Sequence, residues 1–210
     1  MHLSTFEKDT TFKLLSSSCE LFDDAISQVN NSSGIDFVMF SGDMINQPKE
    51  KELLFFIKHA NLLNYPWYAV YGNHDISHGG TLTKKLYFEI LNGHNKNFCY
   101  KTPYYSFTPK KGYKVIALDT IIDYRNTSQG EISEDELIWL KDELDNSKND
   151  IIVIFTHTPI IEPFPSEKHR LINSYEVKVL LKKYDNPIII CSGHYHTTKV
   201  IQENNILYIN

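Results

Sequence analysis

Short apolar runs alternate along this chain with longer amphipathic segments. The length of four of these runs, and the turn-forming residues around them, favour buried strands over helices. These predicted strands cover residues 37–43, 67–71, 151–155 and 187–191. The segments between them carry apolar residues at spacings of three and four, which is typical of helices that bury one face. This alternation predicts a protein of the α/β class.

The amphipathic segments also give the expected bounds of the helices. An apolar face that includes Leu15, Phe22 and Ile26 predicts a first helix over residues 10–30. Further helices are expected over 48–64, 81–91 and 174–184, and a capping-box pattern at 133–136 opens one more. Two hairpins are expected, one from 104–107 with 113–118 and one from 197–201 with 206–209.

Polar side chains of the kinds that bind metals follow each of the four buried strands. They are Asp43, Asn73 with His74, His157, and His194 with His196. A lone histidine after a strand is more often a cap or a surface residue than a ligand. Because the carboxyl ends of strands in an α/β sheet open onto one crevice, four such endings in order point instead to a shared site. Asp, Asn and His together suit one or two divalent cations such as Mn, Fe, Zn, Ni or Co, whereas Mg or Ca alone would favour an all-oxygen shell.

The composition limits the classes of protein that fit. The 210 residues, 41% hydrophobic and 22% charged, are typical of one globular domain, which we expect over 1–210. A formal net charge of -5 argues against a nucleic-acid surface, and no apolar run reaches the roughly 20 residues of a membrane helix. Three cysteines without paired spacing favour reduced thiols in the cytoplasm over a disulfide framework.

The four strand ends also resemble the motifs of a known family. Four segments of the chain resemble, in this order, the motif series of the calcineurin-like metallophosphoesterases: Gly42-Asp43, Gly72-Asn73-His74-Asp75, Thr156-His157 and Gly193-His194-Tyr195-His196. Within this family, the chain also resembles the class III cyclic-nucleotide phosphodiesterase branch, at residues 117–120, Gly130 and Trp139-Leu140. The resemblance covers almost the whole chain, and it implies a four-layer α/β/β/α sandwich.

The resemblance also implies a binuclear metal site in a phosphoester hydrolase. Asp43 would bridge two divalent cations. The first cation would be bound by His2 and His196, and the second by Asn73, His157 and His194. In such a site a hydroxide that bridges the cations attacks phosphorus, and His74, which touches no metal, protonates the leaving alkoxide. The implied substrate is a small phosphate ester, either a phosphodiester such as a cyclic nucleotide or a phosphomonoester.

The start of the chain departs from the family pattern. The family opens with a strand that ends in Asp-x-His; His2 matches the histidine, and the aspartate would precede Met1. We therefore expect the first strand to be missing, either because the chain is a fragment or because it starts at a misassigned methionine, and we expect further family strands to be absent at its C-terminus. If the truncation is genuine, the first cation would be held weakly, by His2, Asp43 and His196.

Other functions and other residue roles stay open from the sequence alone. A non-catalytic scaffold of the same fold is the main alternative to an enzyme, whereas the acidic charge disfavours a nuclease. Asp75 could orient an imidazole or cap a turn. Tyr195 could stack on a substrate base or support its turn. Asp119 could belong to the pocket, although we expect it to cap a strand end, and His78 could line the pocket. The remaining histidines are expected to have no chemical role: His59, His94 and His169.

Overall fold

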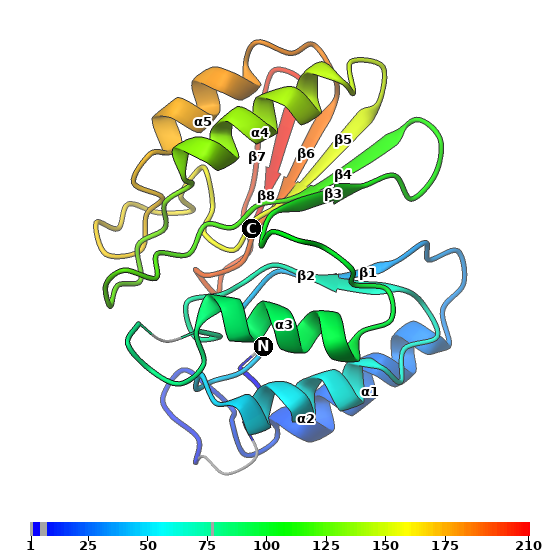
Figure 1. Cartoon of the computed structure of the whole chain (residues 1–210), viewed down its shortest axis with the longest axis vertical. Coiled ribbons are helices and arrows are strands. Elements are labelled where there is room, and N and C mark those ends of the chain that lie inside the picture. Colours follow the sequence, from blue (N-terminus) through cyan, green and yellow to red (C-terminus); the bar gives the residue numbers. More distant parts are fainter. Residues whose placement is uncertain (1, 5–7, 77) are drawn as a thin grey trace. The chain divides into compact units, whose positions relative to one another are not determined.

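Two units make up the computed structural model, which describes residues 2–4, 8–76 and 78–210 (Figure 1). The N-terminal unit comprises Met1–Lys101 with Asp123–Asn126, and the C-terminal unit comprises Thr102–Ile122 with Thr127–Asn210. Each unit has its own sheet with helices, which confirms the predicted α/β class. None of the helices formed by the described residues is long and apolar enough to cross a membrane.

The N-terminal unit contains a parallel pair of strands with helices around it. Its elements are α1 (Ser18–Asn30), β1 (Val38–Phe40), α2 (Glu50–Ala60), β2 (Trp67–Ala69) and α3 (Lys84–His94). Strands β1 and β2 pair from Val38↔Trp67 to Phe40↔Ala69. Because the two strands are parallel, the loops that follow them leave from the same edge, where an α/β sheet binds its ligands.

Aromatic rings form much of the core of the N-terminal unit. Phe56 of α2 stacks on Phe22 of α1 at 5.4 Å and meets Phe40 of β1 edge-on at 5.0 Å. Trp67 of β2 is 2% exposed, and its ring meets those of Phe40 and Phe56 edge-on at 5.7 Å. Each such ring pair adds about 0.5–1.5 kcal/mol to the energy of area burial. The helices are therefore held firmly on the two strands that lead to the predicted ligands.

The C-terminal unit is built on one mixed sheet. Its elements are β3 (Tyr105–Phe107), β4 (Tyr113–Ala117), α4 (Glu134–Asp145), β5 (Ile151–Phe155), α5 (Ser174–Leu181), β6 (Ile188–Cys191), β7 (Val200–Glu203) and β8 (Ile206–Ile209). The strand order is β3-β4-β5-β6-β8-β7, in which β4, β5, β6 and β8 are parallel and the edge strands β3 and β7 are antiparallel. Helices α4 and α5 lie side by side over one face of this sheet (Figure 1).

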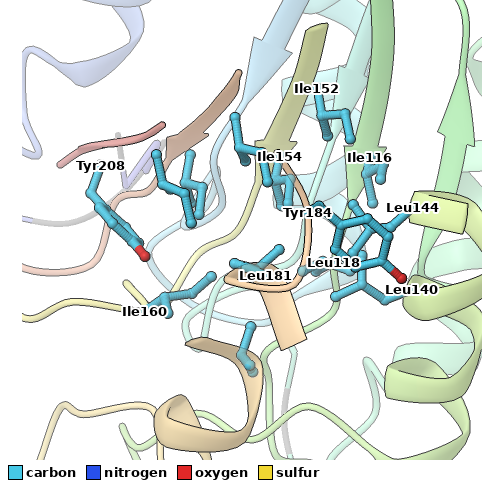
Figure 2. Packing of buried hydrophobic residues seen from close by; sticks show 14 of the residues in the cluster. Ile116, Leu118, Leu140, Leu144, Ile152, Ile154, Ile160, Leu181, Tyr184 and Tyr208 are labelled. Carbon is cyan, nitrogen blue, oxygen red and sulfur yellow. The ribbon is translucent and has the colours of Figure 1, made fainter. Parts of the chain in front are cut away.

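Aliphatic side chains fill the core between this sheet and its helices. Ile152 and Ile154 of β5 are fully buried, as expected for alternate residues that face one side of a sheet. They belong to one cluster with Leu140 and Leu144 of α4 and Leu181 of α5 (Figure 2). Burying a side chain of this size stabilises the folded state by about 1.5–3 kcal/mol. The strand that ends just before the predicted ligand His157 is therefore well anchored.

The predicted strands are present, with shifts at their ends. Strand β5 has the predicted bounds. The strands predicted over 37–43 and 67–71 are shorter, because β1 and β2 give way to turns before the polar residues that follow them. The strand predicted over 187–191 ends as expected at Cys191 and begins one residue later, after Pro187. Both predicted hairpins form, although the first arm of the second one is β7 at 200–203 rather than 197–201.

The first predicted helix was wrong at its start, because α1 begins at Ser18 instead of residue 10. Ahead of it, the hydroxyl of Thr10 accepts hydrogen bonds from the amides of Phe12 and Lys13. The carboxylate of Asp9 accepts another from the amide of Ser16. Side-chain bonds of this kind offer the backbone an alternative to the helical ladder. The apolar period therefore predicted the helix correctly, but hydrogen bonds from local polar side chains delay its start to Ser18.

The hydroxyl contact of the predicted capping box forms at the start of α4. The hydroxyl of Ser133 accepts a hydrogen bond from the amide of Glu136 at 3.2 Å, as such a box requires. The carboxylate of Glu136 accepts a hydrogen bond at 2.8 Å from the amide of Asp119, which lies just after the end of β4. Glu136 therefore ties the helix to the sheet.

Candidate metal centre

The predicted ligands are divided between the two units. The N-terminal unit contains His2, Asp43 and Asn73, together with the predicted acid His74. The C-terminal unit contains His157, His194 and His196. All of them except His2 follow the carboxyl end of a strand, as the sequence predicts.

Asp43 lies in a sharp turn just after β1. It is 4% exposed, and both Gly42 and Asp43 have positive φ angles, of 89° and 53°. Its Oδ1 accepts a hydrogen bond from the backbone N–H of His74 at 2.9 Å. Its Oδ2 lies 3.4 Å from Nε2 of His2. His74, and Asn73 before it, belong to the half-buried turn that follows β2.

His2 is held beside Asp43 by the backbone. Its N–H donates to the carbonyl oxygen of Asp43 at 2.7 Å, and the next residue, Leu3, forms a parallel bridge with Ile45. Burial is the main cause that lowers the pKa of His2 to about 2, and the Asp43 carboxylate only partly opposes it. The imidazole of His2 is therefore neutral, which is the form that binds metals.

An ammonium group contacts both imidazoles of the N-terminal unit. The Nζ of Lys13 lies 3.2 Å from Nδ1 of His2 and 3.4 Å from Nε2 of His74. It also donates to Oδ1 of Asn46 at 2.9 Å. The Nδ1 of His74 donates to the carbonyl oxygen of Asn46 at 2.9 Å, so the other ring nitrogen, Nε2, faces Lys13. Sequence reasoning missed Lys13, because it lay inside the helix predicted over 10–30 and belongs to no motif.

Asp75 caps the turn that follows β2. It is fully buried, its Oδ1 accepts from the amide of Ile45 at 3.0 Å, and its Oδ2 accepts from the amide of Gly72 at 2.8 Å. Both oxygens bind backbone amides, which favours the cap over a role in orienting an imidazole. Burial, followed by the charge of the nearby Asp43, raises the pKa of Asp75 well above its usual range. The carboxyl group thus connects the loops that leave β1 and β2.

Two histidines meet at the ends of neighbouring strands in the C-terminal unit. His157 follows β5 and is 1% exposed, and His194 follows β6. The Nε2 of His157 lies 3.1 Å from Nδ1 of His194. Two imidazole nitrogens at this separation can share a proton or, after losing it, bind one cation. Their chemistry fits a borderline transition metal. His196 lies two residues further along the chain and is exposed.

Backbone strain is concentrated at the predicted ligands. Among the described residues, positive φ angles outside glycine occur at His2, Asp43, His194, His196 and Asn204. Only Asn204, in the turn between β7 and β8, is not a predicted ligand. A residue held in this left-handed region costs about 1–3 kcal/mol, and such residues cluster at functional sites. This observation is independent of the sequence motifs.

The other polar residues singled out in the sequence have ordinary contacts. The Oδ1 of Asp119 accepts from the amide of Ile121 at 3.0 Å, which confirms the predicted cap. His78 is exposed, and its Nδ1 donates to the carbonyl oxygen of Asp123 at 2.7 Å. Tyr195 is 8% exposed, which favours its supporting role over stacking on a substrate.

Comparisons with known proteins identify the family. The family model for calcineurin-like phosphoesterases matches residues 13–198. A probable glycerophosphodiester phosphodiesterase GpdQ of Arcobacter nitrofigilis is 25% identical over 177 residues, which cover 83% of this chain and 61% of that protein. A probable cyclic nucleotide phosphodiesterase of Xenorhabdus bovienii is 24% identical over 192 residues, which cover 86% of this chain and 69% of that protein.

The fold has a solved neighbour as well. The structure of a dimetal phosphatase from Danio rerio matches with a TM-score of 0.72 at 17% identity, covering 94% of this chain and 78% of that one. This likeness confirms the metallophosphoesterase fold. The chain spans less than two thirds of the length of the GpdQ relative. Since the family model matches most of its residues, the chain belongs to the calcineurin-like phosphoesterase family, whose relatives named above are phosphodiesterases and a phosphatase.

Proposed function

We propose that this chain hydrolyses small phosphate esters, and phosphodiesters in particular, with the help of two divalent cations. One observation carries the proposal: four of the predicted metal ligands are the non-glycine residues His2, Asp43, His194 and His196, all with positive φ angles. Such strain persists where function requires a particular side-chain position. The relatives from Arcobacter and Xenorhabdus, both named as probable phosphodiesterases, support the substrate class.

The proposed ligand set follows the family pattern. Asp43 is shared by both cations, and the others divide into two shells: His2 with His196, and Asn73 with His157 and His194. Contacts inside each unit support these roles, since neutral His2 lies 3.4 Å from the Asp43 carboxylate and the two imidazoles of the C-terminal unit face each other at 3.1 Å. These donors suit Mn, Fe, Zn, Ni or Co. When bound, such cations would polarise the phosphate ester and supply an activated water.

His74 is the proposed general acid. Its Nδ1–H donates to the carbonyl oxygen of Asn46, which fixes the orientation of the ring and makes Nε2 the nitrogen that can deliver a proton to the leaving alkoxide. The backbone N–H of His74 also holds the Asp43 carboxylate, so the acid and the shared ligand are positioned by one turn. General-acid catalysis of this kind contributes about 10²–10⁴-fold to the rate.

The setting of the activity is also part of the proposal. The family model spans both units, which supports a single functional domain over 1–210. The net charge of -5 supports a small phosphate ester over a nucleic acid as the partner. All three cysteines are free thiols, which is consistent with a reducing compartment such as the cytoplasm.

Hydrolysis of bis-p-nitrophenyl phosphate, p-nitrophenyl phosphate and cyclic AMP in the presence of Mn tests the proposal. The wild type should hydrolyse the diesters and bind Mn. The variant His74→Ala should keep its Mn affinity and lose activity by about 10²–10⁴-fold. The variant Asp43→Asn should lose both, because the shared carboxylate is gone.

His94→Ala serves as the matched control, because His94 is an exposed histidine at the end of α3. It should change neither activity nor metal binding. Full activity in His74→Ala would overturn the acid assignment. If the wild type neither binds Mn nor hydrolyses any of the three esters, the scaffold interpretation is correct instead.

A further inference from the structure

Two exposed aromatic side chains lie next to the turn that carries the proposed ligand His194. The loop between β5 and α5 presents Phe164, which is 52% exposed and whose ring meets that of Tyr195 at 5.0 Å. His169, in the same loop, is also exposed. Its ring lies 5.2 Å from the ring of His194 and 6.1 Å from that of Tyr195. One loop therefore brings two solvent-facing rings to a single strand end.

Tyr195 supports these rings and is itself covered. It is 8% exposed, so its faces are not open to a ligand. The interplanar angles to Tyr195 are 78° for Phe164 and 70° for His169, so both contacts are edge-on. An edge-on contact with Tyr195 covers at most one face of the outer ring, and the Phe164 side chain is 52% exposed, so surface remains on it for a further stacking partner. Phe164 and His169, and not Tyr195, are therefore the side chains that are exposed enough to stack on a substrate.

The loop that carries Phe164 is fixed by hydrogen bonds on both sides of it. The Nζ of Lys199 donates to the carbonyl oxygen of Pro163 at 2.6 Å. The amide of Ser166 donates to the Glu162 carboxylate at 2.9 Å. A loop that is ordered before its ligand arrives loses little conformational entropy on binding, so its contacts contribute more fully to affinity.

We propose that Phe164 and His169 form a subsite for a flat aromatic group on the phosphate ester, such as a nucleobase. The proposal rests on the proposed phosphoesterase function, because it assigns the substrate's phosphate to the metal ligands and its aromatic group to this loop. Stacking on a protein ring tolerates any base, since every base has a π-face. The subsite therefore selects aromatic over aliphatic phosphate esters rather than one base over another.

AMP and ribose 5-phosphate are the probes that test the subsite, because they share a phosphate and a ribose and differ in the base. Their dissociation constants are measured by calorimetry with Mn present, for the wild type, Phe164→Ala, Phe164→Trp and His169→Ala. The wild type should bind AMP more tightly than ribose 5-phosphate. Phe164→Ala should weaken AMP binding by about 5- to 150-fold, the range expected for loss of one stacking ring. Phe164→Trp should retain the preference, and His169→Ala should reduce it.

Tyr175→Ala is the matched control, since Tyr175 is an aromatic residue of α5 that is 74% exposed. Neither this variant nor the Phe164 variants should change the affinity for ribose 5-phosphate. A wild type without a preference for AMP, including one that binds neither compound, overturns the subsite. So does a Phe164→Ala variant that keeps the full preference. If AMP is preferred through Phe164 but no ester is hydrolysed, the subsite stands and the proposed catalysis fails.

Discussion

A methyl group on the α-carbon of Gly72 would lie 2.0 Å from the backbone nitrogen of Asp43 and 2.2 Å from its Oδ1. Real side chains essentially never approach backbone atoms so closely. The absence of a side chain at Gly72 therefore allows the turn after β2 to come into contact with the turn after β1. It is this approach that lets the backbone N–H of His74 reach the Asp43 carboxylate.

Gly72→Ala should consequently damage both stability and metal binding. Overpacking of this kind costs about 1–3 kcal/mol, and the added methyl would push the Asp43 carboxylate away from its position. We expect a lower free energy of unfolding in urea and weaker Mn binding. The control is Gly93→Ala, because an added methyl at Gly93 in α3 meets no atom within 4 Å. That variant should be as stable as the wild type or up to about 1 kcal/mol more stable, since alanine favours the helix. Equal stability of the two variants would contradict this reading of the contact.

Lys13 should oppose metal binding at His2. Its ammonium lies 3.2 Å from Nδ1 of His2, and a neutral imidazole that binds a cation through Nε2 must carry its proton on that Nδ1. The two donors would then face each other, and the ammonium would also repel the cation. Removing the charge in Lys13→Met should tighten Mn binding by about three- to tenfold, as measured by calorimetry. Lys8→Met, which removes an exposed lysine of the same segment, should leave the Mn affinity unchanged. Weaker Mn binding in Lys13→Met would instead make the ammonium part of the site.

The position of Lys13 illustrates what the sequence could not reveal. The apolar runs fixed the bounds of β5 and led directly to His157, because a strand and the residue after it depend on local pattern. Lys13, in contrast, reaches His2 and His74 only because the hydroxyl of Thr10 replaces a helical turn with a bend. A period of apolar residues carries no information about that side-chain competition.

The loop between β5 and α5 presents the same difficulty. Nothing local relates Phe164 to Tyr195, thirty-one positions later in the sequence. Their contact depends on the parallel pairing of β5 with β6, which brings the two strand ends side by side. Motifs therefore located the predicted ligands, whereas the side chains around them needed the tertiary structure.

Asp75 should contribute to stability more than to chemistry. Asp75→Ala would leave the buried amides of Ile45 and Gly72 without their acceptors, at a cost of about 2–5 kcal/mol in the free energy of unfolding. Asp9→Ala is the matched control, because Asp9 also accepts a backbone hydrogen bond, from Ser16, but at an exposed position where water can replace it. Its effect in urea unfolding should be clearly smaller. If the two variants have the same free energy of unfolding, burial does not make the hydrogen bonds of Asp75 more stabilising than the exposed one of Asp9.

His196 offers a direct test of the strain at the proposed ligands. It is exposed and has a φ of 50°. This left-handed conformation costs a residue with a side chain about 1–2 kcal/mol. Glycine avoids that cost, but it loses about 0.5–1 kcal/mol more in backbone entropy on folding. Metal-free His196→Gly should therefore be more stable than the wild type by about 0.5–1 kcal/mol, while its Mn affinity falls. His196→Ala should lose Mn affinity without gaining stability, since alanine keeps the strain. Asn204→Gly, with a φ of 54° outside the proposed ligand set, should leave Mn binding intact. A gain in His196→Ala equal to that in His196→Gly would show that the side chain, and not the backbone, destabilises this position.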